Sequence, residues 1–193
     1  MFRSISFYPR IAGCGGGFQV PGIHDEAAPT CGREAGDDGT RPDGEGCSAG
    51  DLCAEGWHVC RSENEVAQII GSACRGATDA EGAVFYATRQ SGTGCGNCAM
   101  GTDSTCSRPD DCRRGCADTA VTTNDVFGCG TLGAQPTPTQ CGVLNRSCDD
   151  LCSGLVWPWQ CSGQAGEPTP EDRESLIIVK PGPEAGGVLC CRD

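Results

Sequence analysis

Cysteine content constrains this chain more than any other feature of its sequence. Eighteen of the 193 residues are cysteine, a density typical of secreted domains that are stabilised by disulfide bonds. Thirty glycines and twelve prolines predict many loops, and only ten residues are aromatic. Because so few large apolar side chains make a thin core, we expect cross-links to supply much of the stability.

The cysteine positions predict three segments. Sixteen cysteines follow residue 46, an even number that can close as eight disulfides, and only Cys14 and Cys31 precede them. We predict a signal or lipobox segment over residues 1–14, an acidic, Gly- and Pro-rich disordered linker over 15–46 with Cys31 left over or paired elsewhere, and a disulfide-stapled globular module over 47–193. Spacing does not determine the connectivity. The predicted structural cysteines are Cys47, Cys53, Cys60, Cys74, Cys95, Cys98, Cys106, Cys112, Cys116, Cys129, Cys141, Cys148, Cys152, Cys161, Cys190 and Cys191.

A thiolate zinc site is the alternative for some of these cysteines, because Cys95-x-x-Cys98 has zinc-ribbon spacing. Sixteen cysteines exceed what one or two zinc sites use. The neighbours Cys190 and Cys191 fit poorly on one tetrahedral ion but can point to opposite faces of a strand and bond different partners. We therefore expect disulfides, no metal and an oxidising compartment.

The N-terminal segment Ile11-Ala12-Gly13-Cys14 resembles a bacterial lipobox, in which the cysteine is lipidated after cleavage. Pro9 and Arg10 interrupt the apolar run that should precede it, so a disordered N-terminus with one stray cysteine is the alternative. No run of eighteen apolar residues occurs, so membrane attachment is expected only through a lipid on Cys14. The predicted location is extracytoplasmic, as a secreted protein or an outer-surface lipoprotein.

The formal net charge of −12 argues against nucleic acid as a partner, because phosphate binding needs a basic surface. The acidic residues of the predicted linker invite comparison with a calcium loop, since calcium is bound by clustered carboxylates. Their spacing does not fit an EF-hand, so we expect no cofactor, with calcium the one cofactor considered. The residues concerned are Asp37, Asp38, Asp43 and Glu45.

Residues 52–70 predict a strand that turns directly into a helix. Residues 56–61 form the strand candidate, and Ser62 with Glu65 forms a capping box in which each side chain accepts the other's backbone N–H. The helix that follows has an apolar stripe at Val66, Ile69 and Ile70. We expect the rest of the module to pack around this segment.

Other short elements complete a small α+β, loop-rich module with antiparallel strands and two or three helices. Residues 83–88, 175–180 and 187–191 are strand candidates, the last two joined as a hairpin. Residues 109–116 and 147–151 are helix candidates.

Candidate functional residues are few. Trp157 and Trp159 lie two apart in an extended stretch, which would put both rings on one face as a platform for a sugar or peptide, or over the disulfide core. Asp125 and Glu167 are further ligand-binding candidates, although Asp125 also fits a turn. His58 is more typical of a structural histidine than of a catalytic base.

The order of Cys53, Trp57-His58-Val59, Ser62 and Glu65, followed by a terminal GGVLCC strand, resembles a C-type lectin-like module. The resemblance implies a loop-rich second half and a terminal strand whose cysteine bonds back to the first helix. The family's central Trp-Ile-Gly motif is absent. Its sugar-binding calcium signature is resembled only by Glu167-Pro168-Thr169 or Gln135-Pro136-Thr137.

These observations predict a non-enzymatic, extracellular or cell-surface binding and adhesion module that recognises a glycan, a matrix polymer or a protein. One alternative is a secreted hydrolase or enzyme inhibitor that uses Asp125, His58 or Glu167. Another is a structural surface protein without a specific ligand.

Overall fold

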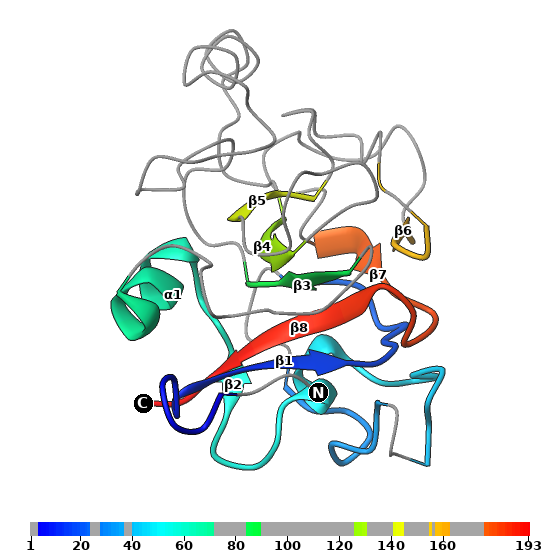
Figure 1. Ribbon diagram of the computed structural model, residues 1–193. Coiled ribbons are helices and arrows are strands. Elements are labelled where there is room, and N and C mark those ends of the chain that lie inside the picture. The colour runs from blue at the N-terminus through cyan, green and yellow to red at the C-terminus, as the bar shows by residue number, and fades with distance from the viewer. Residues whose placement is uncertain are drawn as a thin grey trace, which may run out of the picture.

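The computed structural model describes residues 4–23, 28–36, 40–71, 84–89, 126–130, 141–144, 155, 157–162 and 176–193 (Figure 1). These residues contain one complete α-helix, one short 3-10 helix and eight strands, and residues 176–177 are also helical. In chain order the elements are β1 (Ile11–Gly15), η1 (Ala49–Leu52), β2 (His58–Val59), α1 (Glu63–Ile70), β3 (Phe85–Ala87), β4 (Phe127–Gly130), β5 (Cys141–Val143), β6 (Gln160–Cys161), β7 (Ile178–Val179) and β8 (Gly186–Cys191).

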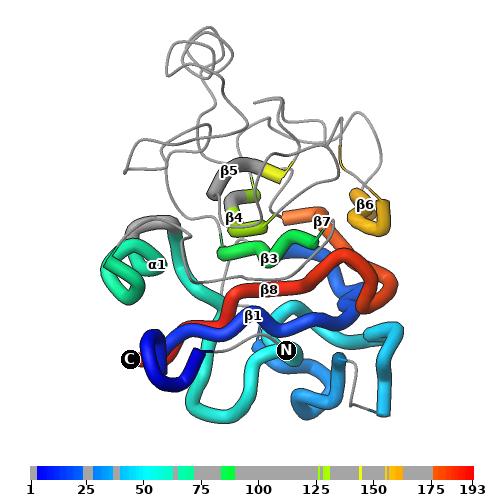
Figure 2. The backbone as a smooth tube through the Cα atoms, in the orientation of Figure 1, coloured from blue at the N-terminus to red at the C-terminus, as the bar shows by residue number. Residues whose placement is uncertain are grey.

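Strand β8 is the centre of a six-stranded sheet, and Figure 2 shows it lying between β1 and β3. One edge pairs antiparallel with β1, from Ile11 opposite Cys191 to Gly15 opposite Gly187. The other edge pairs with β3, which runs parallel, and with the two residues of β2, which run antiparallel. Strands β4 and β5 extend the sheet beyond β3. The segments before η1 and after β7 therefore meet in the middle of the fold.

Successive residues of β8 serve two apolar clusters because side chains alternate across a strand. Val188 and Cys190 pack in one cluster with Phe18, Phe85 and Trp159. Leu189 and Cys191 pack in the other cluster, which α1 covers through Val66 and Ile70. Every residue of β8 is buried, as expected for a central strand.

Two glycines of β8 permit this close packing. A Cβ on Gly187 would lie 2.1 Å from the carbonyl oxygen of Cys14 in β1. Gly186 has a φ of 110°, and a Cβ there would lie 2.1 Å from the carbonyl oxygen of Phe85 in β3. Only glycine lets both neighbouring backbones approach this closely.

The helix that the capping residues predict is confirmed. Ser62 Oγ accepts the Glu65 N–H at 3.4 Å, and Gly71 ends the helix with a φ of 76°. Val66 and Ile70 are buried. The reciprocal bond differs, because the Glu65 carboxylate accepts the N–H of Arg61 instead of that of Ser62.

Disulfides tie the segments before α1 to β8. Cys53 bonds to Cys190 and Cys60 to Cys191, so the prediction that the vicinal cysteines serve opposite faces and different partners is confirmed. Cys129 and Cys161 are also disulfide-bonded. The expectation of a small, disulfide-rich fold of short strands with few helices is therefore confirmed for the described residues.

The described residues between 15 and 46 differ from the disordered linker expected for this segment. Cys31 bonds to Cys47, Phe18 and Ile23 are fully buried, and a β-bridge joins Ala35 to Arg41. The described parts of this segment, 15–23, 28–36 and 40–46, are thus built into the fold. Because Cys47 bonds to Cys31, the sixteen later cysteines do not pair only among themselves, and of the two outcomes expected for Cys31 the structure shows pairing.

The hairpin predicted for residues 175–180 and 187–191 is also wrong. The second strand exists as β8, but of the first only Ile178–Val179 is a strand, because residues 176–177 are helical. That short strand, β7, pairs with β6 in a separate two-stranded sheet. Both edges of β8 are already occupied by β1, β2 and β3. The helices predicted at 109–116 and 147–151 lie outside the described residues. Nowhere in the described part of the chain is a helix long and apolar enough to cross a membrane.

Candidate functional site

The tryptophan pair does not form the two-ring platform that its spacing predicts. Trp157 is 73% exposed, whereas Trp159 is only 2% exposed. The Trp159 ring packs edge-on against Phe18 and Phe85, with ring centroids 6.2 and 6.1 Å apart. Trp157 and Pro158 form a turn before β6, so the alternation of a strand does not apply. Of the two rings, only that of Trp157 is placed for a ligand.

The other ligand-binding candidates, Asp125 and Glu167, lie outside the described residues. Lys180, the chain's single lysine, is fully buried, with its ammonium 5.6 Å from the Trp159 ring centroid. Its Nζ donates to the carbonyl oxygens of Gly16 and Gly186, so it joins the segment after β1 to the start of β8. This lysine belongs to the core.

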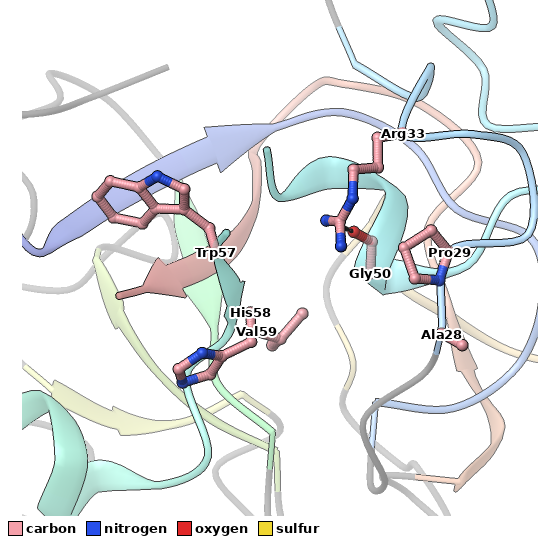
Figure 3. Close-up of a pocket in the computed structure, with 7 residues that line it drawn as sticks. All are labelled: Ala28, Pro29, Arg33, Gly50, Trp57, His58 and Val59. Carbon is pink, nitrogen blue, oxygen red and sulfur yellow. Dashed lines mark hydrogen bonds between the residues drawn. The ribbon is translucent and has the colours of Figure 1, made fainter. Parts of the chain in front are cut away.

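A pocket of about 250 Å³ lies between β2 and the loop before η1 (Figure 3). Residues 57–59 form one wall, and residues 28–33 with η1 form the other. The lining residues are Ala28, Pro29, Arg33, Gly50, Trp57, His58 and Val59. Three of them come from the segment expected to be a linker, so the sequence patterns did not predict this pocket.

Asp51 holds the loop wall in place. Its buried carboxylate accepts the backbone N–H groups of Thr30, Cys31, Arg33 and Ser48 at 2.8–3.0 Å. Burial raises the pKa of Asp51, but the four backbone N–H groups together lower it more, so this pKa lies below the ordinary value of 3.8. The carboxylate is therefore charged wherever the protein is folded near neutral pH.

The Asp51 network was missed in the sequence although a signal was present. Ser48-x-x-Asp51 is a capping pattern of the same kind as Ser62-x-x-Glu65. In the structure Asp51 reaches back to the N–H of Ser48, which is the N-cap of η1. The pattern predicts η1, but not the loop from residue 30 that folds over it.

Arg33 closes the gap between the loop and η1, and Figure 3 shows its guanidinium directed at Gly50. Nη1 donates to the carbonyl oxygens of Gly50, Cys53 and Ala54, at the end of η1. Arg33 itself has a φ of 65°, in the left-handed region. The carbonyl bonds and the N–H bond to Asp51 hold this unfavourable conformation.

The β2 wall is fixed by covalent bonds on both sides. The Cys53–Cys190 disulfide precedes Trp57, and the Cys60–Cys191 disulfide follows Val59. His58 Nε2 lies 2.9 Å from Glu65 Oε1 on α1, so its ring is oriented by a carboxylate. The wall therefore presents a half-buried tryptophan and a positioned imidazole on a cross-linked frame.

The residues that line the pocket carry an indole ring, a guanidinium and an imidazole, and Figure 3 shows the Trp57 and His58 rings extending from β2 on the side away from Arg33. Indole faces bind the apolar faces of sugar rings or peptide side chains, and the polar groups fix the orientation of a ligand. Of its seven lining residues, none carries a hydroxyl, a thiol or a carboxylate. The lining offers groups for binding.

No protein-family model matches this chain, and no solved structure matches it.

Proposed function

We propose that this chain is a binding module of an extracytoplasmic compartment and that it recognises an extracellular glycan, matrix polymer or protein. The observation that carries the proposal is the pocket at Trp57, held between two disulfides that both end on β8. A rigid site loses little conformational entropy when a ligand binds. Such a frame therefore suits recognition better than it suits a site that must open and close.

The compartment follows from the sulfur chemistry. At least three disulfides indicate an oxidising environment. Among oxidising environments, we propose the space outside the cell, which the protein would reach by secretion. Cys14 lies in β1 opposite Val188, and lipidation there follows cleavage after Gly13, which would remove Ile11–Gly13 from the central sheet. A lipid anchor at Cys14 and an intact β1 therefore exclude each other, and the intact mass of the exported protein distinguishes them.

Binding is tested by glycan-array and matrix pull-down assays on the folded, oxidised chain. We expect Trp57→Ala to weaken binding at least tenfold and Trp57→Phe to keep most of it, because a ring face remains. Phe7→Ala is the matched control, since Phe7 is exposed and does not line the pocket. Binding that is unchanged in Trp57→Ala would refute the assignment of the pocket, and loss only in Trp157→Ala would move the site to β6.

A secreted hydrolase is the second candidate, and the 2.9 Å contact between His58 and Glu65 favours it, because a carboxylate that orients an imidazole is a common feature of general bases. Activity screening decides between the two. Turnover that is lost in a folded His58→Ala variant would replace the binding proposal, whereas no turnover with saturable binding would retain it.

A further inference from the structure

Three side chains with metal-binding groups meet where β2, α1 and the residues after β8 come together. One imidazole nitrogen of His58 and one carboxylate oxygen each of Glu65 and Asp193 lie within 4.8 Å of one another. His58 pairs with Cys191 in the sheet, which brings the chain leaving β8 past the imidazole. The cluster thus joins three segments that the Cys60–Cys191 disulfide holds together.

We propose that His58, Glu65 and Asp193 bind a divalent transition-metal ion of the zinc class, which takes the place of the Arg61 guanidinium. One imidazole and two carboxylates form a three-ligand set that zinc accepts, with a fourth position left for water. This site uses no thiolate, so it is compatible with disulfides throughout the module. It revises the expectation of no metal, which considered zinc only on cysteines.

The distances suit such an ion after a small movement. Ligand atoms about 2.0–2.1 Å from a tetrahedral ion lie about 3.3 Å apart. The His58–Glu65 pair, at 2.9 Å, needs to open by a few tenths of an ångström. Asp193 must approach, and its side chain is 83% exposed, so nothing packed around it opposes that rotation.

Glu65 is already oriented for the role. One of its carboxylate oxygens accepts the backbone N–H of Arg61, and the other faces His58. A ligand whose second oxygen is held by a backbone donor keeps its orientation when an ion arrives. The capping bond at the start of α1 therefore acts as the outer support of the proposed site.

Arg61 shows that the cluster attracts a cation. Its Nη1 lies 3.2 Å from Glu65 Oε1 and 3.6 Å from Asp193 Oδ1. One guanidinium facing two carboxylates leaves a net negative charge. Arg61 is 44% exposed, and ion pairs of this kind contribute little net stability. A divalent ion carries twice the charge of the guanidinium and can also bind the imidazole nitrogen, so it can displace Arg61 from the two carboxylates.

The donor set also selects among ions. Calcium takes six to eight oxygen ligands and has little affinity for imidazole, so the cluster favours zinc and similar transition metals. His58 also lines the proposed ligand pocket. Metal binding is nevertheless measured directly, so the two proposals can fail independently.

The test is calorimetric titration of the chelator-treated, oxidised full chain with zinc chloride and, separately, with calcium chloride. We expect one zinc ion per chain and no saturable calcium binding. His58→Ala and Asp193→Asn should each weaken zinc binding at least tenfold. Arg61→Gln should strengthen it, because the competing cation is removed.

Two features make the titration decisive. Asp193 and Arg61 are exposed, so Asp193→Asn and Arg61→Gln retain the fold and decide the outcome even if His58→Ala does not fold. His24 is the only other histidine, and His24→Ala should leave the affinity and stoichiometry unchanged. Absence of saturable zinc binding, or zinc binding that Asp193→Asn leaves unaltered and Arg61→Gln does not strengthen, would overturn the proposal.

Discussion

At the scale of single residues, Asp51 is the position where one substitution should be most costly. Asp51→Asn replaces an oxygen that accepts N–H groups with an amide that donates to them, and leaves buried donors unsatisfied. We expect a loss of about 2–4 kcal/mol in unfolding free energy at pH 7, measured by urea denaturation. Asp43→Asn, at an exposed position, should change it by less than about 0.5 kcal/mol. Equal effects of the two substitutions would show that the network contributes little.

At low pH, the stabilisation of the fold by the Asp51 carboxylate should be lost. Its folded pKa is below 3.8, so the unfolded chain takes up the proton first as the pH falls. The stabilisation is fully present above about pH 4, declines below that value and is lost once the pH passes the folded pKa. The difference in unfolding free energy between the parent and Asp51→Asn should therefore shrink between pH 7 and pH 2.5, as urea titrations at several pH values would show. A constant difference would contradict this explanation.

Two substitutions at Arg33 distinguish the contribution of its guanidinium hydrogen bonds from the cost of its left-handed backbone conformation. Arg33→Ala and Arg33→Gly both remove the guanidinium bonds to Gly50, Cys53 and Ala54, but only glycine adopts a φ of 65° without strain. The glycine variant should be more stable than the alanine variant by about 0.5–1 kcal/mol, with both below the parent. Thermal denaturation in parallel would measure this, and the reverse order would mean that the loop changes conformation.

At the scale of elements, the contact between β1 and β8 depends on Gly187. Gly187→Ala places a methyl group against the Cys14 carbonyl oxygen, which belongs to a backbone that cannot move aside cheaply. We expect a loss of about 3 kcal/mol. Gly56→Ala is the matched control, because Gly56 has a φ of 76° and nothing lies within 4 Å of the place that a Cβ would take, so it should cost only about 1 kcal/mol. Chemical denaturation of both variants tests the difference.

Elements that are encoded by neighbouring residues could be predicted from the sequence, whereas elements formed by pairing with distant segments could not. Helix α1 is encoded locally, by Ser62, Glu65 and an apolar stripe that ends at Gly71. Strand β1 reads IAGCG, with two glycines and no polar alternation. Its strand conformation comes from pairing with β8, near the other end of the chain. Local signals therefore predict α1 correctly, whereas they place β1 in a signal segment.

At the scale of the whole molecule, the two disulfides on β8 should stabilise it in a non-additive way. Cys53–Cys190 and Cys60–Cys191 close loops of 137 and 131 residues. The first such bridge contributes about 5 kcal/mol by loop entropy, but the second then closes only about nine residues and contributes about 2.5 kcal/mol.

Removing either bridge by paired Cys→Ala substitutions should therefore cost about 2.5 kcal/mol, and removing both about 7.5 kcal/mol. Denaturant titration of the two double variants and the quadruple variant measures the three values. Additive losses would indicate that native contacts, and not the constraint on the unfolded chain, dominate.

The candidate site was predictable only in part, because some of its residues act through contacts with distant parts of the sequence. Cysteine density correctly indicated the type of scaffold, and Trp57, His58 and Glu65 all lie in the segment expected to organise the module. Arg33 and Asp51 act through bonds between residues about twenty apart, and no periodic pattern marks such contacts. The spacing of Trp157 and Trp159 misled because it assumed a strand where the chain makes a turn.

The central position of β8 sets the order of events when the protein is made. β1 and β2 pair only with a strand that is synthesised after them, so neither can join the sheet while the chain is still emerging. In an oxidising compartment, the thiols of Cys53 and Cys60 can meet oxidants before their native partners, Cys190 and Cys191, are in place. Any bond that these thiols form in the interval is non-native, and thiol–disulfide exchange must replace it before β8 can be linked to both segments.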